Sequence, residues 1–288
     1  MNYIVFDLEW NQPMDEMTTV TEPFYFPGEI IEIGAVKLDD DFRAVDELRL
    51  YIKPVFYPRL HKKIISLTKI RDADLQDALP FPEAYAQFIA WCGEEYTFMT
   101  WSLSDLPVLA DNLFIHGMDA SEFPVCCDLQ RIFGREIMRA ERRCSLEHAM
   151  EILNESGEAA HDALHDARNT VKVCGYLDLA EYLGEYSAKL FTEPPQRERY
   201  ENARAMLADP ALSRFACPWC GAETVCEPWV PFVSGHAAYA RCPEEEDEFL
   251  VQVFPERERY GKCRARRFFF EMSDDLWELY QDRKSRQN

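Results

Sequence analysis

The sequence predicts an α/β fold, in which a mixed sheet is flanked by helices, followed by a small cysteine-bearing domain at the C-terminal end. The first part of this prediction rests on three strand-like segments followed by alternating helical and strand-like segments, which is typical of a sheet with helices on both faces. The second part rests on a C-x-x-C pair, Cys217 and Cys220, that follows a proline-rich break in the alternation.

The strand predictions come from runs of apolar and β-branched residues that are bounded by turn residues. The first run, Ile4-Val5-Phe6, stands near the start of the chain, and the second strand reads EIIEIGAVKL. Strands are expected over 3–9, 29–38, 45–52 and 96–101, with an acidic hairpin turn at 39–41 between the second and the third.

The helix predictions come from apolar residues that recur every three or four positions. Pro80 and Pro82 stand at the entrance of the first helix, and Ser145 is a good N-cap for a later one. Helices are expected over 81–91, 105–114, 145–153 and 162–182, then a polar helix over 196–207 and a last helix from about Ser273.

The segment Glu193-Pro194-Pro195 interrupts the alternating pattern and is the clearest boundary signal. We therefore expect a first domain over 1–187, a linker helix within 188–212, and a cysteine-bearing domain over 213–288.

Length and composition indicate a soluble protein of the cytoplasm. The chain has 288 residues, and it opens on a strand instead of a basic and apolar leader. No run approaches the roughly 18 apolar residues of a membrane span. Its ten cysteines are therefore expected as reduced thiols or metal ligands rather than disulfides.

The net charge of −21 is unusual for a protein that binds a polyanion, and most of the acidic excess lies before residue 196. Binding to long nucleic acids should therefore be weak in the first domain. A local basic cluster in the second domain could hold a nucleic acid strand, or could be an ordinary solvated strand or turn. Its members are Arg257, Arg259, Lys262, Arg264, Arg266 and Arg267.

Two carboxylates end the first predicted strand. Asp7 and Glu9 directly follow Ile4-Val5-Phe6, and side chains at i and i+2 of a strand point to the same face, about 7 Å apart. Carboxylates so placed can hold a pair of divalent cations about 3.5–4 Å apart, as in two-metal phosphoryl chemistry.

Three residues far along the chain complete this set. Asp105 starts a predicted helix after the fourth strand, and Asp166 lies one turn into another helix, beside small residues that allow close packing on a sheet. His161 precedes that helix in a loop, where an imidazole can take a proton near neutral pH. Each residue alone has an ordinary structural explanation, but their order, spacing and element types agree with one site.

These segments resemble the DEDDh 3′→5′ exonucleases, a group with the ribonuclease H-like fold that includes proofreading exonucleases and exoribonucleases. The resemblance covers residues 1 to about 185. It is carried by IVFDLE at 4–9, GEIIEIGAV at 28–36, TWSLSD at 100–105, and HDALHDA at 161–167, which has the family form H-x-A-x-x-D-A.

The resemblance implies a role for each residue. Asp7 would bridge two Mg²⁺ or Mn²⁺ ions, Glu9 and Asp166 would complete the first ion's site, and Asp105 would hold the second ion. His161 would be the general base. The reaction would release nucleoside 5′-monophosphates from the 3′ end of a single strand.

Two tryptophans are candidate substrate contacts. Trp10 stands where many members of the family have a small residue, so it could stack on the terminal base or pack under the loop that follows it. The spacing of Trp101 and Asp105 resembles the exoribonuclease branch, which favours RNA slightly over DNA.

The cysteine-bearing domain resembles a zinc ribbon. Cys217-Pro218-Trp219-Cys220-Gly221 has the form of a zinc knuckle, and we expect Cys242 and Cys263 to complete a Cys₄ site for one structural Zn²⁺. Cys226 and His236 are alternative ligands. A redox pair or plain thiols are the other interpretations of these cysteines.

The sequence thus predicts a metal-dependent exonuclease acting on single-stranded 3′ ends, with RNA slightly preferred. A DNA exonuclease is one alternative, and a zinc-containing adaptor that binds nucleic acid or protein without cutting is another. The C-terminal domain is expected to hold the substrate strand or a protein partner.

Overall fold

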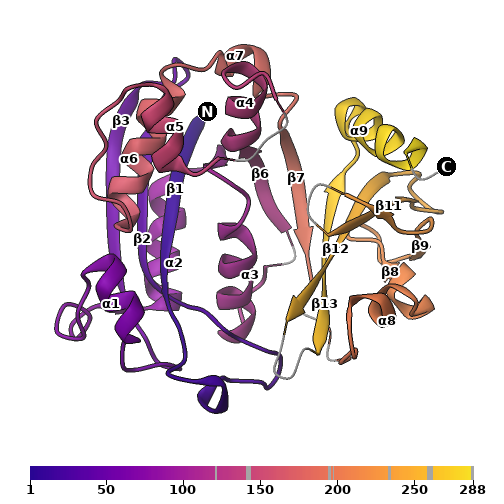
Figure 1. The fold of residues 1–288 in the computed structure, drawn as a ribbon, viewed down its shortest axis with the longest axis horizontal. Coiled ribbons are helices and arrows are strands. Elements are labelled where there is room, and N and C mark those ends of the chain that lie inside the picture. Colours follow the sequence, from indigo (N-terminus) through magenta and orange to yellow (C-terminus); the bar gives the residue numbers. More distant parts are fainter. Residues whose placement is uncertain are drawn as a thin grey trace. The chain divides into compact units, whose positions relative to one another are not determined.

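The computed structural model describes residues 1–120, 122–140, 144–193, 196, 198–232, 235–257 and 262–286. These residues form two compact units (Figure 1). The N-terminal unit comprises Met1–Val20, Phe26–Met118 and Pro124–Ser187. The C-terminal unit comprises Thr21–Tyr25, Asp119–Phe123 and Ala188–Asn288. Pro194 and Pro195, which suggested the boundary, lie outside the described residues.

The N-terminal unit contains a mixed sheet with the strand order β6-β5-β1-β2-β3-β4. The pairs β1/β2 and β2/β3 are antiparallel, whereas β1/β5, β5/β6 and β3/β4 are parallel. The strands are β1 (Asn2–Asn11), β2 (Glu29–Leu38), β3 (Ala44–Lys53), β4 (Leu79–Pro80), β5 (Tyr96–Thr100) and β6 (Glu122–Asp128).

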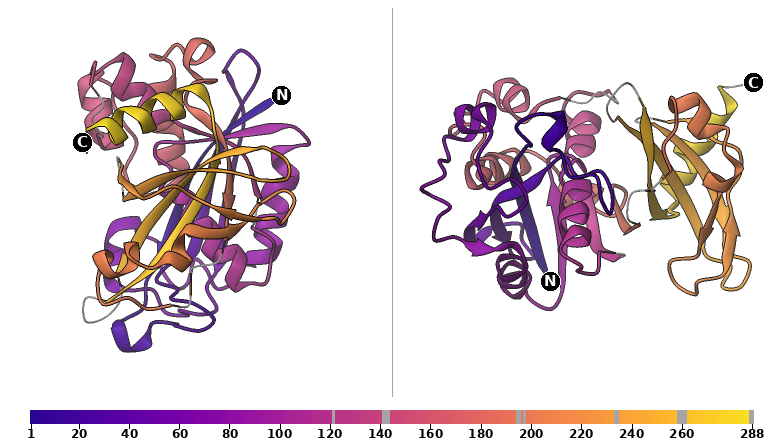
Figure 2. Two further views of the ribbon diagram at one scale, coloured as in Figure 1. Left: turned by 90° about the vertical axis from the view of Figure 1, so that its right-hand side faces the viewer. Right: turned by 90° about the horizontal axis from the view of Figure 1, so that it is seen from below.

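Helices cover both faces of this sheet (Figure 2). On one face Val5 packs in a cluster with Leu164 and Ala167 of α6. The next residue, Phe6, points to the opposite face and contacts Phe88 of α2. The helices are α1 (Lys62–Thr68), α2 (Phe81–Cys92), α3 (Asp105–Ile115), α4 (Leu129–Glu136), α5 (Leu146–Ile152), α6 (Ala163–Cys174) and α7 (Leu179–Tyr182), with a 3₁₀ turn, η1 (Glu16–Thr18), before them.

The four predicted strands of this unit and the helices near 81–91, 105–114 and 145–153 are confirmed to within a few residues. The single helix expected over 162–182 is wrong. It ends at Cys174, because the amides of Tyr176 and Leu177 bond to carbonyls three residues back. Asp178 then caps a new helix by accepting a hydrogen bond from the Glu181 amide. α1, β6 and α4 were not predicted.

The C-terminal unit is an antiparallel sheet with the order β10-β11-β12-β13-β7, accompanied by a separate β8-β9 pair. Its strands are β7 (Ser187–Thr192), β8 (Arg214–Ala216), β9 (Glu223–Val225), β10 (Val230–Pro231), β11 (His236–Arg241), β12 (Glu248–Arg257) and β13 (Cys263–Glu271). Helix α9 (Asp274–Ser285), which contacts β10 and β11, is capped by Ser273 as expected.

The linker helix expected within 188–212 is a second correction. Ala188–Thr192 belongs to β7, which pairs with β13, and the helix α8 covers only Ala203–Leu207, followed by the 3₁₀ turn η2 (Pro210–Ser213). The backbone of Tyr200 exchanges both hydrogen bonds with Cys263, so the chain at Tyr200 pairs as a strand does. Asn202 then caps the short helix. Within the described part of the chain, no helix is long and apolar enough to cross a membrane.

Candidate active site

Asp7 and Glu9 lie on the face of β1 that α6 covers, because they follow Val5 at two-residue intervals. In the pairing with β2, Asp7 stands opposite Gly34 and Glu9 opposite Glu32. A register shift follows immediately after Glu9. Such bulges bend a strand and re-aim the side chains beside them.

Gly34 allows the first turn of α6 to touch β2. A Cβ atom at this position would lie 2.0 Å from the backbone nitrogen of Leu164 and 2.1 Å from the carbonyl carbon of Ala163. Real Cβ atoms do not approach other atoms so closely. The missing side chain therefore lets the helix carry Asp166 to the end of β1.

Asp105 is the first residue of α3 and is only 7% exposed. Its carboxylate accepts a hydrogen bond from the backbone amide of Leu8, the residue between Asp7 and Glu9. This contact joins the start of α3 to the end of β1 and places a third carboxylate there.

His161 is exposed, and its backbone has the left-handed φ of 63°, which is uncommon for a residue other than glycine. Its amide donates a hydrogen bond of 2.9 Å to Oδ2 of Asp166. A nitrogen of its ring and one carboxylate oxygen each from Glu9 and Asp166 all lie within 4.8 Å of one another. Such backbone strain is typical of functional sites.

The carboxylates repel one another and are partly shielded from water. Burial, followed by the charges of Asp105 and Asp166, raises the pKa of Asp7 well above its usual range. Burial and Asp166 raise the pKa of Glu9 to about 8. Burial also raises the pKa of Asp105 to about 7, and it raises the pKa of Asp166. A bound cation would relieve this repulsion, and carboxylate oxygens are the ligands that Mg²⁺ and Mn²⁺ prefer.

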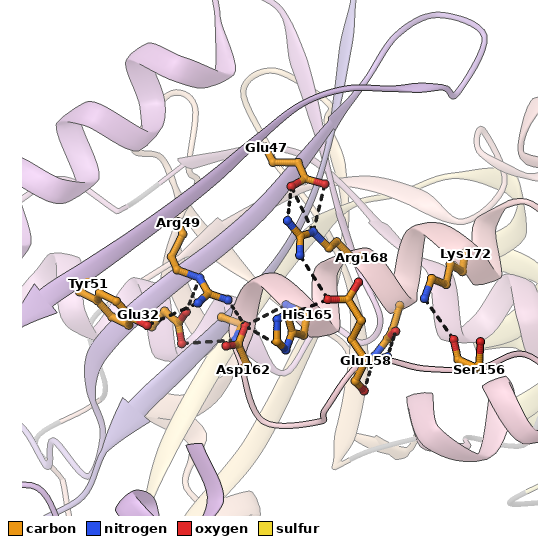
Figure 3. A network of polar contacts seen from close by, with 12 residues as sticks. Glu32, Glu47, Arg49, Tyr51, Ser156, Glu158, Asp162, His165, Arg168 and Lys172 are labelled. Atoms are coloured by element: carbon orange, nitrogen blue, oxygen red, sulfur yellow. Dashed lines mark hydrogen bonds and ion pairs between the residues drawn. The ribbon is translucent and has the colours of Figure 1, made fainter. Parts of the chain in front are cut away.

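A neighbouring network, which the sequence analysis missed, supports the first turn of α6 (Figure 3). Glu32 is 1% exposed and lies 3.3 Å from Nε of Arg49. Arg49 also pairs with Asp162, the N-cap of α6. Burial and the charge of Asp162 raise the pKa of Glu32 to about 7. Glu32 lies within the matched segment 28–36, but nothing in the sequence indicated its partners.

A second group of contacts holds the loop that carries His161 (Figure 3). Asn169 of α6 binds both backbone groups of Glu158. Arg168 joins the carboxylate of Glu158 to that of Glu47 on β3, and Lys172 donates to the Ser156 carbonyl. The loop is therefore tied to α6. His165 lies 3.3 Å from Glu158 as an ion-pair partner.

The two tryptophans differ in their surroundings. The half-buried indole of Trp10 lies against Gly28, where a Cβ would be 2.8 Å from its Cδ1. Trp101 donates its indole N–H to the carbonyl of Cys144 at 3.0 Å and packs edge-on against Phe133. Trp10 directly follows Glu9 in sequence, and Trp101 stands four residues before Asp105. The contacts of Trp101 give it a clear packing role.

In the C-terminal unit, the sulfurs of Cys217, Cys220 and Cys242 lie within 4.8 Å of one another. The expectation that Cys263 is the fourth ligand is wrong. Cys263 is buried on β13 in a different apolar cluster, with Tyr200 and Met206, because its backbone pairs with Tyr200.

The two alternative ligands also lie outside this group of sulfurs. Cys226 belongs to the same apolar cluster as Cys217 and Cys242. It also lines a hollow together with Trp229 and His236.

The basic cluster is not an exposed surface. Arg264, Arg266 and Arg267 are 2%, 1% and 4% exposed, respectively. Arg267 donates two hydrogen bonds to Glu193, of 2.6 and 2.9 Å, and Lys262 pairs with Glu201. The Arg257 side chain and Arg259 lie outside the described residues. The proposed strand-holding role is thus wrong for the three arginines of β13, because other segments cover them. Arg264 donates to the carbonyl of Thr21, and Arg267 donates to the carbonyls of Leu212 and Arg214.

Comparison with known proteins agrees with the geometry. Residues 4–174 match the model of the RNase T family, which is described as exonuclease. KapD of Bacillus subtilis strain 168, a probable 3′-5′ exonuclease, is 26% identical over 179 residues, which are 59% of this chain and 81% of KapD.

Solved structures share the fold. One is a 3′-exonuclease described for 3′-end-specific recognition of a histone mRNA stem-loop (TM-score 0.51, 19% identity, 60% of this chain and 62% of that chain). Another is exonuclease I (TM-score 0.51, 15% identity, 87% of this chain and 55% of that chain). The chain thus spans less than two thirds of either structure. These likenesses confirm the ribonuclease H-like fold. The chain therefore belongs to the exonuclease family.

Proposed function

We propose that this protein removes nucleotides one at a time from the 3′ end of single-stranded nucleic acid, with RNA slightly preferred, and releases nucleoside 5′-monophosphates. One observation carries the proposal. Glu9 of β1, His161 of the loop before α6 and Asp166 of α6 present their ligand atoms within 4.8 Å of one another, beside the half-buried Asp7 and the buried Asp105. Four carboxylates and a histidine in this arrangement suit hydrolysis of a phosphodiester.

The carboxylates of Asp7, Glu9, Asp105 and Asp166 would hold two Mg²⁺ or Mn²⁺ ions. When bound, the ions supply positive charge that stabilises the attacking and leaving oxygens of an in-line displacement. His161 acts as the general base, taking the proton of the attacking water through its ring. The hydrogen bond from its amide to Asp166 keeps the imidazole beside the carboxylates.

We assign the terminal nucleotide to Trp10, which directly follows Glu9, and to Trp101, which stands four residues before Asp105. Trp10 is half-buried, so the part of its indole that does not face Gly28 can stack on a base. Trp101 can contribute only an exposed part of its ring, because its N–H binds Cys144. The preference for RNA rests on relatives described with a histone mRNA stem-loop and with rAMP. We further propose that Cys217, Cys220 and Cys242 hold one structural Zn²⁺.

The test uses one sequence made as RNA and as DNA, each labelled at its 5′ end. The protein is incubated with each strand in Mg²⁺, in Mn²⁺ and in chelator, beside Asp166→Asn. We expect a metal-dependent ladder that shortens from the 3′ end, faster on RNA, and is absent in the variant. Equal or faster shortening of DNA would identify a DNA exonuclease. Binding of either strand without any shortening would favour a non-cutting adaptor and overturn the proposal.

A further inference from the structure

Two turns of the C-terminal unit have the same backbone structure. The first runs from Cys217 to Ala222, between β8 and β9, and the second from Cys242 to Asp247, between β11 and β12. In each turn the amide of the cysteine donates a 2.8 Å hydrogen bond to the carbonyl five residues later. The cysteine that begins each turn is followed by proline.

The match extends to the fourth residue after each cysteine. In the first turn this is Gly221 with a φ of 76°, and in the second it is Glu246 with a φ of 63°. A left-handed residue at this place is expected for glycine and uncommon for glutamate. The second turn therefore keeps the shape of a zinc knuckle without its usual sequence.

The turns also direct backbone amides toward sulfur. In the first, Ala222 donates to Sγ of Cys220, and in the second, Glu244 and Glu245 donate to Sγ of Cys242. The sulfurs of Cys220 and Cys242 are 3.5 Å apart. The two turns thus bring together three of the four ligands of a tetrahedral site.

The residue that matches Cys220 in the second turn is Glu245, because each is the third residue after the first cysteine. We propose that one Zn²⁺ binds the thiolates of Cys217, Cys220 and Cys242, and that the carboxylate of Glu245 is its fourth ligand. Binding releases the three thiol protons. Carboxylate oxygen is a regular zinc ligand.

The Glu245 side chain is exposed and lies outside the group of three sulfurs, so it turns inward when it binds the ion. The turn that carries Cys217 and Cys220 is packed against the sheet. Trp219, between Cys217 and Cys220, packs against Phe191 and Phe249 of the sheet, with ring centroids 4.5 and 4.8 Å apart. This inference rests on the zinc ion proposed above, and does not depend on the exonuclease site.

The experiment measures metal in the full chain, purified under reducing conditions. We expect one zinc per chain. After exchange for Co²⁺, we expect a visible spectrum of a tetrahedral ion with three thiolates. The variant Glu245→Cys should add a fourth thiolate and raise the sulfur charge-transfer absorbance by roughly a third.

Glu245→Ala should weaken zinc binding, measured against a competing chelator, by at least about tenfold, an effect that even outer-shell partners reach. Glu244→Ala, a change of the neighbouring exposed acid, is the matched control and should leave the affinity unchanged. Asp166→Asn should retain its zinc, so loss of nuclease activity is distinguishable from loss of this site.

Three results would overturn the inference. They are a chain without zinc whose thiols are free or joined as Cys220–Cys242, an unchanged zinc affinity in Glu245→Ala, and a Cys263→Ser variant that loses the ion while remaining folded.

Discussion

The two units hold their clusters of ligand atoms in opposite ways. In the N-terminal unit, the carboxylates come from β1, α3 and α6, far apart in the chain, and they repel one another in a partly buried place. In the C-terminal unit, the three sulfurs lie on two short turns, each of which directs backbone amides toward a sulfur. The first cluster therefore costs stability when it is empty, whereas the second is supported by hydrogen bonds within its own turns.

The two clusters therefore need different surroundings. The carboxylates need a scaffold that resists their repulsion, and the pairing of Arg49 with Glu32 and Asp162 supplies part of it. The thiols are held by the geometry of two turns and by the packing of Trp219 on the sheet. Removing a ligand should thus affect activity in the first unit and stability in the second.

Asp7→Asn should have the largest effect. The charges of Asp105, Asp166, Glu9 and Glu32 all act on this carboxylate. Its replacement by a neutral amide therefore removes the central ligand of the proposed cation site. We expect exonuclease activity to fall to background. The melting temperature of the metal-free protein should stay the same or rise, because repulsion is relieved.

Cys220→Ser is the contrasting variant for that measurement. It should lower the melting temperature of the zinc-loaded protein, since a structural zinc site contributes directly to folding. A lower melting temperature in metal-free Asp7→Asn would contradict the proposed contrast between the units.

His161→Ala should lower kcat by about 10²–10⁴-fold, the usual contribution of a general base. Single-turnover hydrolysis of a labelled strand would measure it. His148→Ala is the matched control, because His148 is an exposed partner of Glu151 on α5. Equal activities of the two variants would remove His161 from the reaction.

Gly34→Ala tests how α6 is seated. The added methyl group would meet backbone atoms of Ala163 and Leu164 at about 2 Å, and overpacking costs about 1–3 kcal/mol or more. We expect a lower melting temperature together with reduced activity, because the helix that carries Asp166 is displaced. Gly184→Ala, where a Cβ would meet nothing within 4 Å, should change neither.

Arg49→Met tests the supporting network. The change leaves Glu32 and Asp162 without their shared cation, and we expect about a tenfold loss of kcat, as is common for residues that orient metal ligands. Arg43→Met, which removes an exposed pair with Asp41, is the control. A change in KM alone would argue against a positioning role.

The last expected effect is the pH dependence of stability without metal. Burial and neighbouring charges raise the pKa of Glu9 to about 8 and that of Glu32 to about 7. The folded state therefore keeps protons that the unfolded chain has already lost. This contribution is complete below the unfolded pKa and disappears as the pH rises through about 7 to 8.

The melting temperature of the metal-free protein should accordingly include a term that falls between about pH 5 and about pH 8. The increase caused by Mg²⁺ should grow over the same interval, because the ion competes with these protons. An Mg²⁺ effect that is equal at both ends would show that the carboxylates do not titrate in this interval. Glu9→Gln should reduce the pH-dependent term.

The sequence by itself determined most elements of the N-terminal unit and the order of its five site residues. Periodicity reports which residues share a face, and Asp7 and Glu9 stand on one strand, so their common direction follows from local geometry. The last helix was likewise expected from about Ser273, and α9 begins at Asp274.

Tertiary structure alone decided the pairing of distant segments. It buried Arg264, Arg266 and Arg267, which in sequence resemble a basic surface, and it joined Tyr200 to Cys263 instead of placing that cysteine with the others. It also gave Glu32 its partner Arg49. Such contacts depend on strand register and on packing between segments many residues apart, and local periodicity predicts neither.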